Sequence, residues 1–247
     1  MGIFTFFKQF RQRQKERTIA KNLKTIQNPK AIREERVAAI EYFKGLRDLS
    51  LAVPSLLKRF DYSLDHGIYD TREKESAMEG ILGFGKDSVP YVIEHLRNSN
   101  RIAWPIKVLQ KLADEPSVVN ALEDCLHLTD FQFDRDKIDK NYDILCYLRD
   151  YPVPDKGEKL LGFLDALDER VRFATVEVLL AQNTDKHSKH LARFVLDTTA
   201  ENTRLHQIVV DAFLERGWRL DLDLSPGTAL APGIEYSAER KLRKVRG

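Results

Sequence analysis

The chain of 247 residues has only two cysteines, 12 glycines and 9 prolines, and it contains no long hydrophobic run. Two cysteines are too few for a disulfide framework, which indicates a reducing compartment. The low glycine and proline content excludes a collagen-like or largely disordered chain. A membrane-spanning helix needs about 20 mostly apolar residues, and no such stretch occurs. These absences predict a soluble globular protein that is long enough to bury a large core.

The N-terminus also lacks two targeting patterns. Lys8 and Arg11 interrupt the apolar stretch that a secretory signal peptide would need. Phe6 stands where the N-myristoylation pattern requires serine or threonine. We therefore expect a cytoplasmic protein, and the basic N-terminus raises the alternative of a peripheral position on the inner face of a membrane.

Positive charge is concentrated at both ends of the chain. Residues 1–30 hold eight Lys or Arg and one acid, for a net charge of +7, and residues 235–247 have a net charge of +3. Because the whole chain is only +2, the body between these ends is −8. Basic ends favour anionic partners such as lipid, nucleic acid or an acidic protein surface. They are also compatible with a simple contribution to solubility.

Apolar residues recur at helical spacings as far as about Trp218, and strand-like alternation is nearly absent before it. The helices form pairs, and neighbouring pairs must stack because neither helix of a pair can bury its apolar stripe alone. We predict an all-α fold, an α-solenoid of about six antiparallel helical pairs. The predicted pairs are 19–27 with 29–46, 51–60 with 71–84, 88–97 with 101–113, 117–128 with 134–148, 156–164 with 169–182, and 186–196 with 200–216. Asn28 is expected to cap the second helix, with Pro29 at its first position.

The stretch from Leu160 to Leu180, LLGFLDALDERVRFATVEVLL, resembles a HEAT repeat of the bacterial type that also occurs in bilin-lyase-like proteins. Asp168 and Arg172 match the family's turn aspartate and the arginine that opens its second helix. The resemblance implies that these two residues form a structural ladder between repeats. It covers roughly residues 18–217 as architecture, although only this repeat matches the motif well. HEAT-like repeats are mostly binding scaffolds, so the resemblance implies a partner without specifying it.

Three parts are predicted along the chain. Residues 1–17 form a basic, amphipathic, Phe-rich helix, and residues 18–217 form the HEAT-like repeat domain. From Trp218 to Leu224 apolar and charged residues alternate, and prolines and glycines follow. We therefore expect residues 218–247 to be a strand or an extended C-terminal arm with a basic end, which packs across the last repeat or adds to a partner's sheet.

The search for catalytic chemistry gives only weak candidates. His187 and His190 lie one helical turn apart, a spacing compatible with a metal, and His206 or Glu201 is a conceivable third ligand. An exposed polar helix start explains the same pattern, and we favour that interpretation. No serine or cysteine nucleophile has a histidine nearby in a recognisable pattern. We therefore predict no catalytic residue, no metal and no cofactor, and an enzyme is the minority interpretation.

The first predicted binding surface is the N-terminal helix. Its phenylalanines recur at the spacing of one helix face, with basic residues mostly elsewhere. Such a helix suits the surface of anionic lipid or the groove of a partner protein. A cap over the open end of the first repeat explains it equally well. The residues predicted to dock are Phe4, Phe6, Phe7, Lys8, Phe10 and Arg11.

The second predicted surface consists of two long turns, residues 61–70 and 129–136, which mix aromatic with acidic residues. Both turns link the first helix of a pair to the second, so on a solenoid they emerge from one edge, about 20 Å apart. Such an edge favours a partner with basic and apolar groups, unless the aromatics fold back onto their own helices. The predicted partner-binding residues are Tyr62, Asp65, Tyr69, Phe131, Phe133 and Asp134.

Together these features predict a non-enzymatic scaffold or adaptor that binds another protein. Residues 1–17 would attach it to a membrane or a membrane-associated complex, with contact to anionic lipid. The first alternative is nucleic-acid binding, by analogy with the HEAT-like alkylpurine DNA glycosylases. That activity requires a basic concave face, and the acidic body argues against it. A cofactor-handling, lyase-type role is a further alternative that rests on fold analogy alone.

Overall fold

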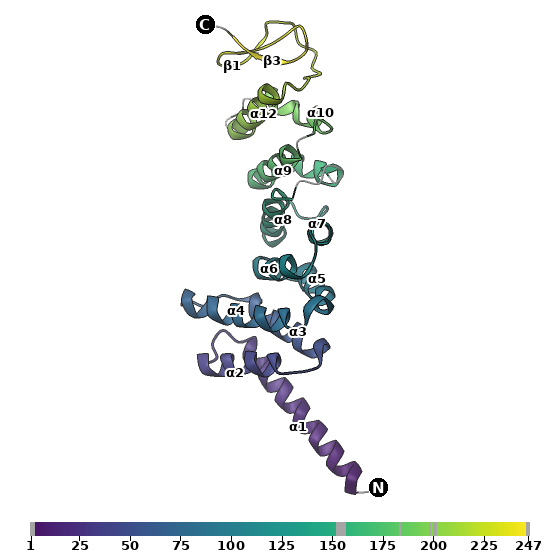
Figure 1. The fold of residues 1–247 in the computed structure, drawn as a ribbon. Coiled ribbons are helices and arrows are strands. Elements are labelled where there is room, and N and C mark those ends of the chain that lie inside the picture. The colour runs from purple at the N-terminus through teal and green to yellow at the C-terminus, as the bar shows by residue number, and fades with distance from the viewer. Residues whose placement is uncertain (1–2, 152–156, 183, 198, 200–201, 246–247) are drawn as a thin grey trace. The chain divides into compact units, whose positions relative to one another are not determined.

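The structure, a computed structural model, describes residues 3–151, 157–182, 184–197, 199 and 202–245, with the backbone alone for residues 3–8. The chain is mostly helical, as the sequence predicts (Figure 1). It divides into two compact units, unit 1 from Met1 to Cys125 and unit 2 from Leu126 to Gly247. The division falls between the two helices of the fourth predicted pair. The segment 18–217, predicted as one repeat domain, is therefore described in two parts.

Unit 1 consists of helices arranged in two layers. The first helices of the predicted pairs, α1, α3 and α5, contact one another in sequence, and the second helices, α2, α4 and α6, do the same. Each apolar stripe is therefore covered by its own pair and by the next one. The elements are α1 (Ile3–Ile26), α2 (Arg33–Lys44), α3 (Leu49–Leu57), the 3-10 helix η1 (Lys58–Asp61), α4 (Gly67–Leu82), the 3-10 helix η2 (Gly85–Ser88), α5 (Val89–Asn98), α6 (Ala103–Leu112) and α7 (Glu115–Asp124).

Helix α1 is longer than the sequence indicates. The predicted docking helix, 1–17, and the predicted first repeat helix, 19–27, are one continuous helix from Ile3 to Ile26. The turn after it also differs from the prediction. Helix α2 begins at Arg33, whereas the Asn28 side chain accepts a hydrogen bond from the backbone N–H of Lys30. Asn28 and Pro29 therefore form the turn and do not start the second helix, because this short side-chain bond stabilises a turn just as well.

Unit 2 contains the second helices of the last three predicted pairs, α8, α9 and α12, which lie side by side. The elements that precede α9 and α12 in the chain are short. Helix α9 packs against α8 and α12. Where the sequence predicts α-helices over 156–164 and 186–196, the structure has a 3-10 helix and two single-turn helices. Gly157 and Gly162 lie in the first of these segments, and glycine weakens an α-helix. The helical elements are α8 (Arg135–Leu148), η3 (Gly157–Asp165), α9 (Glu169–Ala181), α10 (Ser188–Leu191), α11 (Arg193–Leu196) and α12 (Thr203–Arg216).

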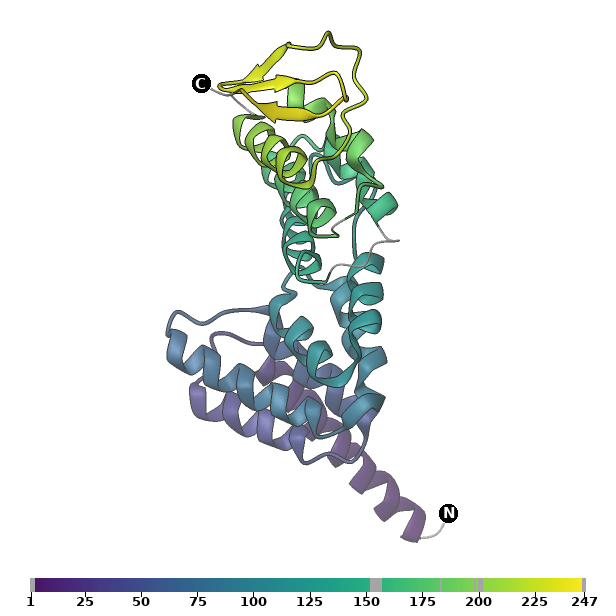
Figure 2. The same ribbon diagram turned by 45° about the horizontal axis from the view of Figure 1, so that its top comes forward.

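The C-terminal residues form a small antiparallel sheet, which the sequence does not predict. Strands β1 (Ala229–Ala231), β2 (Ile234–Tyr236) and β3 (Leu242–Lys244) pair in the order β1-β2-β3 (Figure 2). The predicted strand-like segment 218–224 contributes only one isolated bridge, between Arg219 and Lys241. Gly233, which looked like a break in structure, lies at φ 71° in the turn that joins β1 to β2.

The sheet belongs to the core of unit 2. Leu230, Tyr236 and Leu242 are buried in the same apolar cluster as Leu205 and Phe213 of α12. The hydroxyl of Tyr236 donates to the backbone oxygen of Leu220 at 3.1 Å, which fastens the segment before the sheet. Residues 218–245 are therefore a packed part of unit 2 and do not extend away from α12.

Candidate functional site

Apart from Val245 near the C-terminus, the large exposed apolar side chains described in unit 2 lie at the connections that lead into α8, α9 and α12. We name this region the turn edge: residues 126–134, 166–168 and 196–202, as far as they are described. Phe133 is 94% exposed, Leu167 is 62% exposed, and Leu128 and Leu196 are about half exposed. A cluster of solvent-exposed apolar side chains marks a candidate interaction site.

The loop that carries Phe133 is firmly attached to the unit. The Asn141 side chain is completely buried, accepts from the backbone N–H of His127 at 2.8 Å and donates to its backbone oxygen at 2.9 Å. Phe131 is buried, and its ring lies 5.2 Å from that of Phe163. Two ordered contacts therefore fix the loop before it reaches Phe133.

Two further contacts fix the loop on the other side. The Gln132 side-chain oxygen accepts from the backbone N–H of Leu167 at 2.8 Å, which links the loop to the turn before α9. The carboxylate of Asp134 accepts from the backbone N–H groups of Asp136 and Lys137 and so caps the N-terminus of α8. Phe133 therefore points into solvent from a loop whose adjacent residues, Gln132 and Asp134, are fixed by hydrogen bonds.

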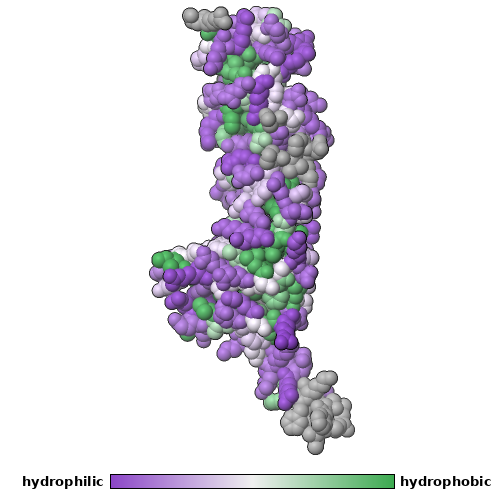
Figure 3. Space-filling view, in the orientation of Figure 1, coloured by the Kyte–Doolittle hydropathy of each residue, from purple (hydrophilic) through white to green (hydrophobic). Residues whose placement is uncertain are grey.

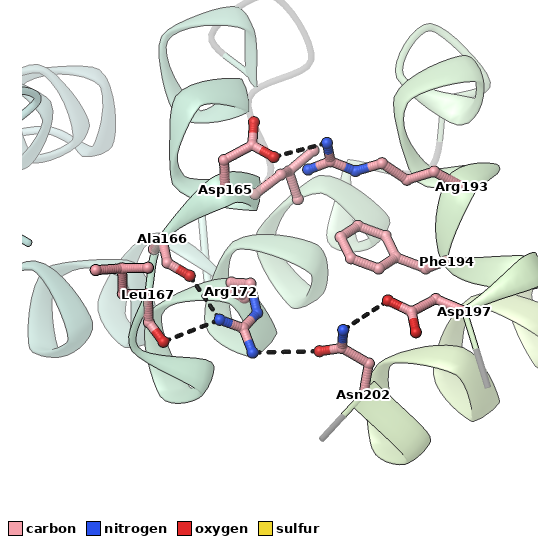
Figure 4. Close-up of a pocket in the computed structure, with 9 residues that line it drawn as sticks. Asp165, Ala166, Leu167, Arg172, Arg193, Phe194, Asp197 and Asn202 are labelled. Carbon is pink, nitrogen blue, oxygen red and sulfur yellow. Dashed lines mark hydrogen bonds and ion pairs between the residues drawn. The ribbon is translucent and has the colours of Figure 1, made fainter. Parts of the chain in front are cut away.

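A pocket of about 380 Å³ opens beside Leu167 (Figure 4). The buried Phe194 ring lies between two polar links that connect successive helical pairs. In one link, Arg193 pairs with Asp165 at 2.7 Å. In the other, Arg172 donates to the side-chain oxygen of Asn202 at 3.2 Å. The polar groups around the pocket are therefore largely engaged with one another, and an apolar floor is left between them.

The ladder residues implied by the HEAT resemblance contact different partners. Asp168 caps α9 through the backbone N–H of Arg170 and pairs with the Arg170 guanidinium at 2.9 Å. Arg172 donates instead to the backbone oxygens of Ala166 and Leu167, at 2.6 and 3.0 Å, in addition to Asn202. The two residues thus hold the same turn without pairing with each other.

Arg36 of unit 1 makes the same type of contacts as Arg172. Its guanidinium donates to the backbone oxygens of Pro29 and Ala31 in the preceding turn, and it pairs with Glu73 of the next helical pair at 2.9 Å. Each arginine therefore binds the carbonyl five residues before it and a polar side chain of the following pair. Both arginines stand in an Arg-x-Ala sequence, Arg36-Val-Ala and Arg172-Phe-Ala.

The aromatic residues predicted to bind a partner in unit 1 mostly contact their own chain. Tyr62 donates to the backbone oxygen of Ile26 at 2.8 Å, and burial raises the pKa of its hydroxyl. Tyr69 stacks on His66 at 4.1 Å, with the Arg33 guanidinium 4.1 Å from its ring centre. Asp65 is exposed. The loop is also shorter than predicted, because α4 begins at Gly67.

A buried network of charged residues, which was not predicted, lies beneath this loop. Glu73 accepts from Arg36 and Arg59, and Asp70 accepts from Arg59 and Lys74 at 2.7 Å each. Burial alone would raise the pKa of the Asp70 carboxyl, but the hydrogen bonds from Lys74 and Arg59 outweigh it and leave that pKa below its ordinary value. The network joins the first two helical pairs, and its role is structural because its donors and acceptors bind one another.

A second hollow of unit 2, of about 310 Å³, lies on the outer faces of α8, α9 and α12. The Arg170 guanidinium lies 5.3 Å from the ring centre of Tyr142, and that of Arg204 lies 4.4 Å from the ring centre of Phe173. Burial raises the pKa of the Cys146 thiol at its floor, which disfavours the reactive thiolate. Nothing in this hollow forms a nucleophile with an adjacent base.

The predicted docking residues of the N-terminus lie on the first turns of α1. Phe10 is 51% exposed, and Arg11 is exposed as well. Phe4, Phe6, Phe7 and Lys8 belong to the same helix, and their side chains lie outside the described residues. Residues 9–18 are all exposed, so this stretch does not cover the first helical pair.

Two of the histidines considered as metal ligands, His187 and His206, contact different parts of unit 2. His187 is buried against Gly157, and the Nδ1 of His206 lies 3.1 Å from the backbone oxygen of Phe194. Among the residues that the structure describes, no group of three histidine, cysteine or carboxylate side chains could hold a metal ion. Glu201 lies outside the described residues.

We expect unit 2 to lose stability as the pH falls below about 6.5. Burial lowers the pKa of His187 below its ordinary value of 6.5, and the charges of Lys186 and His190 lower it further. The unfolded chain therefore binds a proton at a higher pH than the folded one does. The stability contributed by neutral His187 is complete above pH 6.5 and is lost below it.

Urea unfolding followed by Trp218 fluorescence, in a Trp104→Phe background, measures the slope of the free energy of unfolding of unit 2 against pH. His187→Gln should make the slope shallower, and burial lowers the pKa of His127 too, so part of the slope should remain. An unchanged slope in His187→Gln would show that protonation of His187 does not cause the loss of stability.

Among the helices that the structure describes, none is both long and apolar enough to cross a membrane. No protein-family model, curated protein or solved structure matches the chain. Its function must therefore be argued from its own residues.

Proposed function

We propose that the chain is a non-enzymatic protein-binding scaffold built on HEAT-like helical repeats, and that the turn edge of unit 2 binds the partner. One observation carries the proposal: Phe133 is almost fully exposed on a loop that is anchored by buried Phe131 and by hydrogen bonds at His127 and Gln132. A large aromatic side chain that is held in water by a rigid support contributes little to folding. Such rigid aromatic anchors often dominate the energetics of protein interfaces.

The charges near Phe133 favour a partner with both apolar and basic groups. Asp130 and Asp136 are exposed on either side of it and have no ion pair with a described residue. The pocket at Leu167 and Phe194 offers room for one apolar side chain next to the anchor. Together these features describe a partner segment that carries a large apolar residue and one or two lysines or arginines.

The proposal is tested by site-specific photo-crosslinking. A benzophenone amino acid replaces Phe133 in the cells that make the protein, and the same amino acid replaces exposed Leu51 of unit 1 as the control. The crosslinked protein is identified, purified and titrated against the full chain. Phe133→Ala should then weaken its binding by about 10- to 100-fold, the effect of removing an interface anchor. Equal crosslinking at both positions, or unchanged affinity of Phe133→Ala, would refute the turn edge as the binding site.

A further inference from the structure

The first described side chains of helix α1, residues 9–18, have no packing partner in unit 1. Residues 9–18 are all exposed, and burial begins only beyond them, until Ile26 is completely covered. The contacts of α1 within the unit are with α2 and α3, and both ribbon views show the helix extending away from them (Figures 1 and 2). Most helices gain their stability from tertiary packing. Residues 9–18 of α1 are therefore available to another surface.

The residues of the first half of α1 combine aromatic and basic character. Positions 3, 6, 7 and 10 fall on one helix face, and they hold one isoleucine and three phenylalanines. The bases that follow are spread around the helix, and Glu16 is the only acid of α1. Figure 3 shows the described part of this half as hydrophilic. The bases after the aromatic turns are Lys8, Arg11, Arg13, Lys15 and Arg17.

This distribution distinguishes between possible occupants. A protein groove contacts one face of a helix, and bases on the other faces would stay unused. A nucleic acid attracts the bases but offers no apolar phase for the phenylalanines. An anionic bilayer supplies both, because apolar side chains enter the headgroup boundary while long basic side chains reach the headgroups from several sides.

We propose that the first half of α1 binds the surface of an anionic lipid bilayer, with Phe10 and the preceding aromatic positions at the headgroup boundary. The bases from Lys8 to Arg17 then lie within reach of the anionic headgroups. The helix lies on the bilayer and does not cross it. This inference is independent of the turn edge, because no residue of unit 2 takes part in it.

The test uses the full chain and sedimentation with vesicles of phosphatidylcholine, with and without phosphatidylserine. We expect binding to the phosphatidylserine vesicles that weakens as salt is added. The triple variant Arg11→Gln, Arg13→Gln, Lys15→Gln should lower the partition coefficient about 100-fold, since each base near such a surface contributes about 1 kcal/mol. The matched control removes three exposed bases elsewhere in unit 1, Arg72→Gln, Lys86→Gln and Lys111→Gln, and should leave the partition coefficient unchanged.

A second set of variants tests the contribution of the aromatic side chains to lipid binding. Phe10→Trp should be quenched by brominated lipid, whereas Trp104 and Trp218 of the wild-type chain should not. Phe10→Ser should lower the partition coefficient about tenfold. Equal binding to neutral vesicles, or full binding by the triple variant, would overturn the proposal. Stronger binding to duplex DNA than to phosphatidylserine would assign the helix to nucleic acid, and dimerisation lost in Phe10→Ser would assign it to a second copy; either result would also overturn it.

Discussion

Glu73→Ala should lower the free energy of unfolding of unit 1 by about 4 kcal/mol. The Glu73 carboxylate is 2% exposed and accepts from two guanidiniums, Arg36 at 2.9 Å and Arg59 at 2.8 Å. Alanine would leave the buried Arg36 guanidinium without its carboxylate, whereas Arg59 would keep its pair with Asp70. The cost of such an unpaired buried charge exceeds the net value of the ion pair itself. Urea unfolding followed by Trp104 fluorescence, in a Trp218→Phe background, reports on unit 1 alone.

The matched control is Glu75→Ala on the same helix. Glu75 is exposed, so its replacement should change stability by less than about 0.5 kcal/mol. The double variant Arg36→Met, Glu73→Met should be more stable than Glu73→Ala, because one of the buried charges is removed together with its partner. A loss below about 1 kcal/mol in Glu73→Ala would mean that the guanidiniums reach water or other acceptors.

Asn141→Ala should lower the free energy of unfolding of unit 2 by about 3 kcal/mol. The Asn141 amide satisfies both backbone groups of His127, and alanine leaves that N–H and that oxygen without a partner. Unpaired buried polar groups are more costly than the average hydrogen bond is stabilising. Trp218 fluorescence in the Trp104→Phe background measures the change.

The same variant tests how the loop positions Phe133. If the loop is loosened, partner binding at Phe133 should weaken even under conditions where unit 2 is still folded. Gln207→Ala, at an exposed position of α12, serves as the control for both measurements. Unaltered stability in Asn141→Ala would show that water replaces the amide at His127.

Helix positions were predictable because most helices bury one face, which imposes the 3.6-residue spacing on the sequence. Asp134 and Asp168 stand directly before their helices as caps, close to the predicted starts. The continuous α1 was not predictable in the same way, since residues 11–18 are polar on every side. The sheet was missed because strands of three residues are too short to show an alternation.

The candidate site was predictable only as a region. Phe131 and Phe133 look alike in the sequence, and they differ because the Phe163 ring, 32 positions further on, covers only the first. Tyr62 is likewise held by a carbonyl from the end of α1. The charged network left a weak signal: Arg36 and Glu73 occupy positions three or four residues from buried Ala39 and Ala77, on the faces that a helix buries.

The small sheet also determines how far the helical stack of unit 2 can extend. Figures 1 and 2 show α9 and the sheet on opposite sides of α12. A stack of helical pairs that ended in a bare apolar face would offer that face to another molecule, and repeated stacking would produce a filament. Here Leu230, Tyr236 and Leu242 occupy the face first. The C-terminal strands therefore cover the apolar face that a further helical pair would need for stacking.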